Sequence, residues 1–192
     1  MTPRAAPRHR APLTLADATA LSVIPDYKLD RMIDAAVQSL LIPGDMAELG
    51  VYRGGSALIL GRVAALQDRT LHLFDTFAGM PTVGPFDQHL PGDFRASLQE
   101  VRAALRGLPV KFHVGVFPHL KLPPGPFCFV HLDCDLKQSY ADGLAYFWPR
   151  LSSGGRLVLD DYEVPSCPGA TLAVREFFEP LGIYPNAEMQ KP

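Results

Sequence analysis

The feature that most limits how this chain can fold is a strand, a glycine turn and a helix in direct succession. Residues 45–56 read DMAELGVYRGGS. An apolar stretch therefore ends at one glycine, and a second pair of glycines opens a helix. Glycines at such a turn let the backbone approach a bound small molecule closely, and the first turn of the helix presents free N–H groups. After the first strand of an α/β sheet, this turn is the usual place for a nucleotide-like cofactor.

The turn also indicates which cofactor to expect. It does not read G-x-G-x-x-G, which disfavours a dinucleotide bound through its pyrophosphate. Glu48 stands just before the first glycine, and a carboxylate there suits a cofactor that carries positive charge better than one that carries phosphates. These two observations favour S-adenosylmethionine.

Helical and strand patterns alternate along the rest of the chain. Residues 127–132 form a continuous apolar run, as expected of a central parallel strand that is covered on both faces. The helix over 29–41 carries apolar residues at helical spacing, with Lys28, Asp30, Asp34 and Gln38 expected on its outer face. Repeated βα units with short connections predict an α/β fold with a doubly wound, mostly parallel sheet. We expect strands at 47–49, 71–74, 110–114, 127–132 and 156–159, and further helices at 56–66, 95–105, 140–148 and 171–178.

Composition fits one domain and excludes some classes of partner. The 192 residues are 47% hydrophobic, which is enough to bury a full core. The net charge of −2 argues against nucleic acid or an anionic membrane as a partner, and no apolar run reaches the length of a membrane span. Three cysteines without C-x-x-C spacing predict reduced thiols and a cytoplasmic protein. Whether the protein forms homo-oligomers stays open.

The two ends of the chain are expected to differ from the centre. Residues 1–25 begin with a basic, proline-containing stretch that has no apolar signal-peptide core, so we expect a flexible arm before a domain over 26–192. At the other end, the sequence stops soon after Ile183 and Tyr184. We therefore expect the sheet to lack a complete C-terminal hairpin.

One connection is too long to be only a connection. Residues 76–94 follow a strand and contain apolar and aromatic residues, and loops of this length in compact domains are often lids. We expect a lid over the carboxyl edge of the sheet. His89 on this loop can reach a substrate, although a solvated loop histidine is the simpler interpretation.

Five aspartates follow strands. Asp75 ends the second strand, where an acidic residue in nucleotide-binding folds bonds ribose hydroxyls; a cap of the turn at 76–77 is the alternative. Asp133 and Asp135 follow the fourth strand, and Asp160 and Asp161 end the fifth. These four carboxylates meet at one edge and cannot all stay ionised without a cation. Oxygen ligands predict Mg²⁺ or another hard divalent cation.

Four ordered blocks, at 48–56, 74–81, 132–136 and 154–162, resemble the macrocin O-methyltransferase (TylF-type) family. The resemblance implies a class I methyltransferase fold that uses S-adenosylmethionine and a divalent metal, commonly Mg²⁺, to methylate sugar hydroxyls of natural products. It places the metal on Asp133, Asp160 and Asp161. It places the cofactor on the turn and the strand ends, at Glu48, Gly50, Tyr52, Arg53, Gly54, Ser56, Asp75, Thr76 and Asp133.

These residues predict an O-methyltransferase that acts on a hydroxyl of a small-molecule acceptor. A metal that chelates two adjacent acceptor oxygens lowers the pKa of the hydroxyl, and Asp135 or His89 takes its proton. Two alternatives stay open. Asp133-Cys134-Asp135 is the D-x-D of metal-dependent glycosyltransferases, although the glycine turn argues against that class. The chain can also be a non-catalytic relative that only binds the cofactor.

Overall fold

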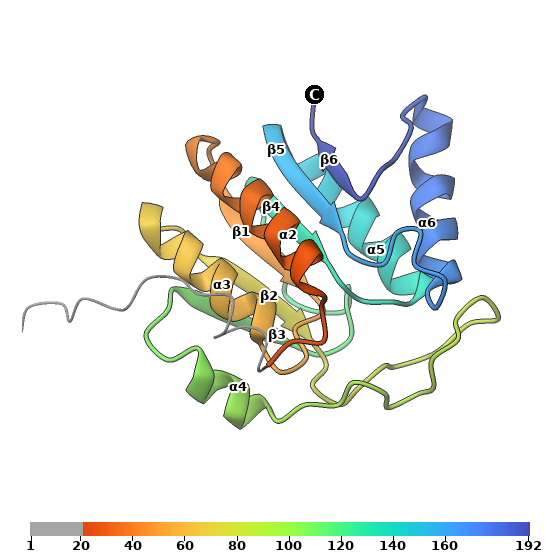
Figure 1. Cartoon of the computed structure of the whole chain (residues 1–192), viewed down its shortest axis with the longest axis horizontal. Coiled ribbons are helices and arrows are strands. Elements are labelled where there is room, and N and C mark those ends of the chain that lie inside the picture. Colours follow the sequence, from red (N-terminus) through yellow and green to blue (C-terminus); the bar gives the residue numbers. More distant parts are fainter. Residues whose placement is uncertain (1–20) are drawn as a thin grey trace, which may run out of the picture.

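The computed structural model describes residues 21–192, so most of the expected N-terminal arm lies outside the described residues. The described chain alternates helices with strands, as expected (Figure 1). The helices are α2 (Asp26–Gln38), α3 (Gly55–Ala64), α4 (Leu98–Ala104), α5 (Lys137–Phe147) and α6 (Pro168–Phe178). The strands are β1 (Asp45–Leu49), β2 (Leu71–Asp75), β3 (Val110–Val114), β4 (Phe127–Leu132), β5 (Leu151–Leu159) and β6 (Glu188–Gln190).

The strands form one mostly parallel sheet. Their order is β3-β2-β1-β4-β5-β6, and only β6 runs antiparallel to its neighbour. Strands β1 and β4 are adjacent in the sheet but distant in sequence. Successive strands are added to one side of β1 up to β3 and to its other side from β4 onward, and ligands of such folds bind at this switch point. Strand β6 completes the described sheet by pairing with β5 at one edge.

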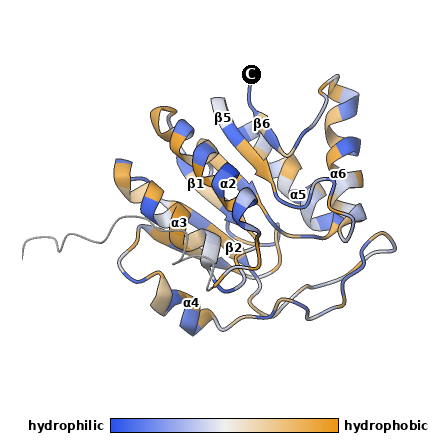
Figure 2. Cartoon of the chain, viewed as in Figure 1, coloured by the Kyte–Doolittle hydropathy of each residue, from blue (hydrophilic) through white to orange (hydrophobic). Residues whose placement is uncertain are grey.

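Two apolar layers enclose the sheet. Helices α2 and α3 pack on one face, and α5 and α6 pack on the other (Figure 1). Figure 2 shows the apolar residues gathered on the strands, while α2 turns polar residues outward. Every residue of β4 is buried, which is why this strand reads as an unbroken apolar run. No helix among residues 21–192 is both long enough and apolar enough to cross a membrane.

Several element boundaries differ from the predicted ones, because of contacts both near and distant in sequence. Strand β5 begins at Leu151 rather than at residue 156, since its first half pairs with β4 across a register shift and Gly154 N–H donates to Lys191 O of the C-terminal segment. Helix α4 begins only at Leu98, because the Ser97 hydroxyl accepts the Glu100 N–H and caps the helix. Helix α5 begins at Lys137, three residues earlier than predicted.

Candidate functional site

A cavity of about 260 Å³ opens at the carboxyl ends of β1, β2, β4 and β5. The glycine turn, the strand-end aspartates and the long loop all contribute to its lining. Residues 21–25, the described part of the expected arm, line it as well. The position at the topological switch point is the one at which folds of this kind bind small molecules.

The turn after β1 is held close to the neighbouring strand. Gly50 has φ +90°, and a Cβ there would lie 1.7 Å from Asp133 O. Only glycine fits this contact. One oxygen of Asp75 accepts the N–H groups of Val51 and Tyr52, at 2.7 and 2.9 Å, and the other accepts the N–H of Phe77 at 2.7 Å. Asp75 therefore fixes the turn and also caps residues 76–77, which was the structural alternative for this residue.

The structure brings most of the predicted cofactor residues to the cavity, but not all of them. Arg53 and Gly54 do not line it, and the Arg53 guanidinium lies 5.1 Å from the ring centre of its neighbour Tyr52. The residues of the predicted set that line the cavity are Gly50, Tyr52, Ser56, Asp75, Thr76 and Asp133.

Glu48, whose charge was used to infer the cofactor from the sequence, does not lie in the wall of the cavity. Its side chain is completely buried, does not line the cavity, and lies 3.0 Å from His131 Nδ1. Alternation along β1 puts Glu48 on the same face as Met46, beneath α2 and α3, rather than at the strand end. In this structure the Glu48 carboxylate therefore lies beneath the cavity and does not form part of its wall.

His131 joins Glu48 to the aspartates. Its Nε2 lies 3.9 Å from Asp160 Oδ1, while its Nδ1 faces Glu48. Burial alone would lower the pKa of His131, but the two flanking carboxylates raise it to about 10. An imidazolium is thus held beneath the site and offsets part of its negative charge.

Three aspartates converge as the strand order predicts. Asp133, Asp160 and Asp161 each place a carboxylate oxygen within 4.8 Å of the others. Burial and the charges of Asp160 and Asp161 raise the pKa of Asp133 well above its ordinary value. Burial, followed by the charges of Asp135 and Asp160, raises the pKa of Asp161 to about 7. A divalent cation would relieve this crowding, and an all-carboxylate donor set suits a hard one.

Lys28 is a site residue that the sequence did not reveal. The predicted outer face of α2 included it, yet its side chain is only 11% exposed and lines the cavity. Its Nζ donates to Asp160 O at 2.7 Å and to Asp160 Oδ2 at 2.9 Å. Burial lowers the pKa of Lys28, but the hydrogen bond and charge of Asp160 leave it raised. With His131, Lys28 keeps the pKa of Asp160 below its ordinary value despite burial.

The long loop reaches across the cavity to the helices on the far side of the switch point. Asp87 Oδ1 accepts the Lys137 N–H at 2.8 Å, so a loop side chain caps α5. A Cβ on Gly169, at the start of α6, would lie 2.3 Å from the same oxygen, and glycine is needed there to admit the carboxylate. This cap explains why α5 begins earlier than its own sequence indicates.

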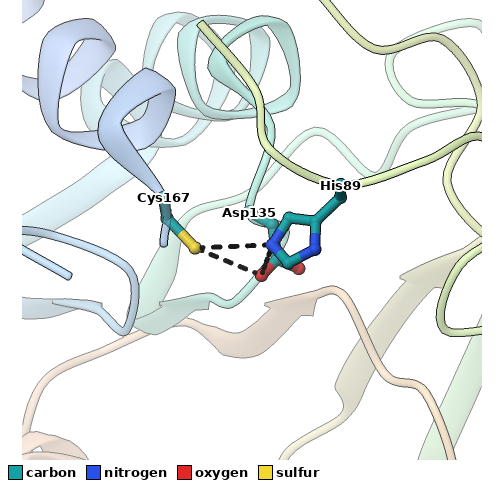
Figure 3. Close-up of side chains that lie close together, drawn as sticks. All are labelled: His89, Asp135 and Cys167. Carbon is teal, nitrogen blue, oxygen red and sulfur yellow. Dashed lines mark hydrogen bonds and ion pairs between the residues drawn. The ribbon is translucent and has the colours of Figure 1, made fainter. Parts of the chain in front are cut away.

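The two predicted proton acceptors lie side by side. His89 Nε2 of the loop is 3.4 Å from Asp135 Oδ1, and Cys167 Sγ lies 3.5 Å from that oxygen and 3.7 Å from His89 Nε2 (Figure 3). Burial raises the pKa of Asp135 to about 6, and the hydrogen bond from the Cys167 thiol opposes this rise. The sequence predicted only that Cys167 is a reduced thiol, and nothing in its local pattern places it here.

The D-x-D interpretation of Asp133 and Asp135 finds no support in this geometry. Asp133 faces Asp160 and Asp161, whereas Asp135 faces His89 and Cys167. The left-handed backbone of Asp135, at φ +56°, turns the two carboxylates to different groups. The two aspartates therefore do not act as one ligand pair.

Comparisons with known proteins give a consistent result. The family model described as macrocin-O-methyltransferase (TylF) matches residues 5–186. A similar protein is 8-demethyl-8-(2,3-dimethoxy-alpha-L-rhamnosyl)-tetracenomycin-C 4'-O-methyltransferase of Streptomyces olivaceus, which is 34% identical over 67% of this chain and 57% of that protein. The chain spans 57 to 63% of the length of the curated relatives it matches.

Solved structures share the fold. The structure of the O-methyltransferase NovP aligns with a TM-score of 0.77 and 27% identity, and the alignment covers 89% of this chain and 82% of that one. The O-methyltransferase TomG from Streptomyces achromogenes, solved in complex with SAM, aligns with a TM-score of 0.56 and 19% identity over 88% of this chain and 75% of that one. The latter likeness concerns the fold alone.

Proposed function

Because the chain belongs to the macrocin-O-methyltransferase (TylF) family, we propose that it transfers a methyl group from S-adenosylmethionine to a hydroxyl of a small molecule. The observation that carries this proposal is a single cavity that joins the glycine turn to three converging aspartates. A sugar of a natural product is the proposed acceptor, since the relative named above methylates the 4' oxygen of a rhamnosyl-tetracenomycin.

S-adenosylmethionine would lie along the turn at residues 50–56 and the end of β2. Three of the roughly four lone-pair positions of the Asp75 carboxylate already accept backbone N–H groups. Asp75 therefore has room for about one ribose hydroxyl while it holds the turn in place. Gly55 and Ser56, at the start of α3, line the cavity, and the first N–H groups of a helix have no partner within the helix and can bind polar groups of a ligand.

Asp133, Asp160 and Asp161 would hold a divalent cation, with Mg²⁺ the best match to their donor set. The fit is supported by the raised pKa values of Asp133 and Asp161, which burial and then the charges of the neighbouring carboxylates cause and which a bound cation would oppose. When bound, such a cation lowers the pKa of a chelated hydroxyl and orients two adjacent oxygens. Vicinal diols are therefore the expected acceptors.

Asp135 is the proposed proton acceptor, with His89 beside it. A pKa of about 6 leaves Asp135 ionised at neutral pH and still basic enough to accept a proton during the reaction. The loop that carries His89 also lines the cavity through Met80 and Phe94, so it would exclude water around the reacting atoms. The Tyr52 ring stacks edge to face on Phe94 at 5.5 Å, which offers the acceptor an apolar wall.

We further place the protein in the cytoplasm, in keeping with three free cysteines at positions 128, 134 and 167. The main alternative function is a relative that binds the cofactor without catalysis.

The test is a methyl-transfer screen against deoxysugars with vicinal diols and against catechols, with excess Mg²⁺ or with EDTA, followed by mass spectrometry. Calorimetry with S-adenosylhomocysteine runs alongside it. Methylated product that forms with Mg²⁺ and not with EDTA supports the proposal. Product that forms equally with EDTA would reject the role of the cation. Cofactor binding without any product favours the non-catalytic relative, and absence of binding would reject the whole proposal.

A further inference from the structure

Three side chains of different chemistry meet on one side of the cavity. His89 comes from the long loop, Asp135 from the connection between β4 and α5, and Cys167 from the residue just before α6 (Figure 3). We call these three residues the mixed-ligand cluster. Its donors are a ring nitrogen, a carboxylate oxygen and a thiol sulfur, whereas the aspartate cluster offers oxygens only.

Cys167 Sγ forms hydrogen bonds with Asp135 and His89 in this structure, and the distances within the mixed-ligand cluster also suit a shared ion. The N···O separation between His89 and Asp135 is 3.4 Å, longer than the roughly 2.7–3.2 Å of a good N–H···O bond. Around a tetrahedral zinc ion, bonds of about 2.3 Å to sulfur and about 2.0–2.2 Å to nitrogen or oxygen separate the ligand atoms by roughly 3.3–3.6 Å. The N···O and S···O separations of 3.4 and 3.5 Å fall within this range, and the S···N separation of 3.7 Å lies just above it.

We propose that His89, Asp135 and Cys167 form a binding site for a thiophilic divalent cation, and that Zn²⁺ is the ion it suits. Imidazole and thiolate ligands favour Zn²⁺ over Mg²⁺, which prefers oxygen ligands. Binding forms a Zn–S bond as the Cys167 thiol releases its proton to the buffer, and the ion keeps its oxidation state. All three residues line the cavity, so the fourth coordination position faces the space where small molecules bind.

An ion at this site would join the loop to the body of the domain. It would add to the existing links, which include the Asp87 cap of α5 and the contact of the Lys137 ammonium with the Phe86 ring at 4.9 Å. It would also occupy Asp135 and His89. Here the inference rests on the proposed function: if Asp135 accepts the proton of the acceptor, then Zn²⁺ at the mixed-ligand cluster inhibits methyl transfer that Mg²⁺ supports.

The binding claim is tested without cofactor or acceptor, so its failure is separate from failure of the proposed function. The protein, with its thiols kept reduced, is titrated with Co²⁺ in excess Mg²⁺. One equivalent of Co²⁺ should produce a near-ultraviolet thiolate-to-cobalt charge-transfer band, which only a sulfur ligand gives, and Zn²⁺ should abolish the band by displacement. Absence of the band would overturn the proposal.

Matched variants locate the ion. Cys167→Ser should remove the band and weaken Zn²⁺ binding by roughly 100-fold, since removal of even an outer-shell partner costs about 10- to 100-fold. Cys134→Ser removes another thiol that lines the cavity and should leave the band unchanged. Should Cys167→Ser fail to fold, His89→Gln on the loop provides the same affinity test. A band that survives in Cys167→Ser, or that Asp161→Asn abolishes, would place the ion elsewhere and contradict the proposal.

Discussion

Asp75 shows how much one carboxylate does at this site. It accepts three backbone N–H groups from two segments, so it organises the cavity before any cofactor arrives. We predict that Asp75→Ala weakens S-adenosylhomocysteine binding and also lowers the melting temperature of the free protein. Each donor left unpaired costs roughly 1–3 kcal/mol. Calorimetry and thermal unfolding of parent and variant separate the two effects; a variant with the parent's affinity would remove Asp75 from the cofactor site.

A variant at Asp161 tests whether the neighbouring carboxylates form a cation-binding site. Asp161 Oδ2 accepts the Asp135 N–H and contacts the Tyr140 hydroxyl, and an amide oxygen can take over both contacts. In EDTA, Asp161→Asn should therefore melt at or above the parent temperature. Relief of like-charge repulsion by about 1 kcal/mol corresponds to roughly 2–4 °C in a chain of this size.

In Mg²⁺ the parent should have the higher melting temperature, because only the parent gains stability from binding the ion. Melting curves of both proteins in EDTA and in Mg²⁺ decide the matter. If Asp161 were purely structural, the variant would be less stable in both buffers and would respond to Mg²⁺ as the parent does.

Among the elements, the long loop and α5 depend on each other. Asp87 caps α5 from the loop, and loss of a helix cap costs about 1 kcal/mol. We predict that Asp87→Ala lowers the melting temperature by a few degrees and speeds proteolytic cleavage within residues 82–92. Asp142→Ala is the matched control, since among residues 21–192 that carboxylate has a hydrogen bond only from Gln138, on the exposed side of α5. Equal cleavage of Asp87→Ala and the control would show that the cap does not hold the loop.

The start of β1 and the middle of β2 carry a second polar chain, away from the cavity. His72 lies 3.2 Å from Asp45 and 3.0 Å from His113, and its side chain is almost fully buried. Burial lowers the pKa of His72 despite the nearby Asp45 carboxylate, and burial also lowers that of His113.

Because the unfolded chain binds protons more readily at these histidines, their contribution to stability is present above the ordinary histidine pKa of about 6.5 and is lost as the pH falls through it. We predict that His72→Gln loses less stability than the parent between about pH 7 and pH 5. Urea unfolding at several pH values measures the difference. A parallel loss in both proteins would show that His72 does not cause the acid sensitivity.

For the molecule as a whole, the sequence predicted the features that follow from regular hydrophobic patterns and from the order of the strands. The bounds of β3 and β4 were confirmed residue for residue. The convergence of Asp133, Asp160 and Asp161 followed from the rule that parallel strands end at one edge. Strand alternation likewise puts Glu48 on the face of Met46, beneath α2 and α3.

Other parts depend on contacts that no local pattern contains. Lys28 looks like a solvated residue of α2 until the packing of that helix on β4 and β5 brings its ammonium to Asp160. The start of α5 depends on Asp87, fifty residues earlier. Cys167 meets His89 and Asp135 only because α6 begins beside the long loop. In each case the cause is tertiary packing rather than residue propensity.

The proposed function requires that one cavity hold the methyl donor and a divalent cation next to each other. The most direct measurement uses Mn²⁺, which oxygen sites of this kind accept, and S-adenosylmethionine carrying a ¹³C-labelled methyl group. We predict that Mn²⁺ strongly broadens the methyl signal of the bound donor, that Mg²⁺ does not, and that Asp161→Asn abolishes the broadening while the donor still binds. A sharp methyl signal in the parent with both Mn²⁺ and donor bound would show that the donor and the cation do not lie next to each other.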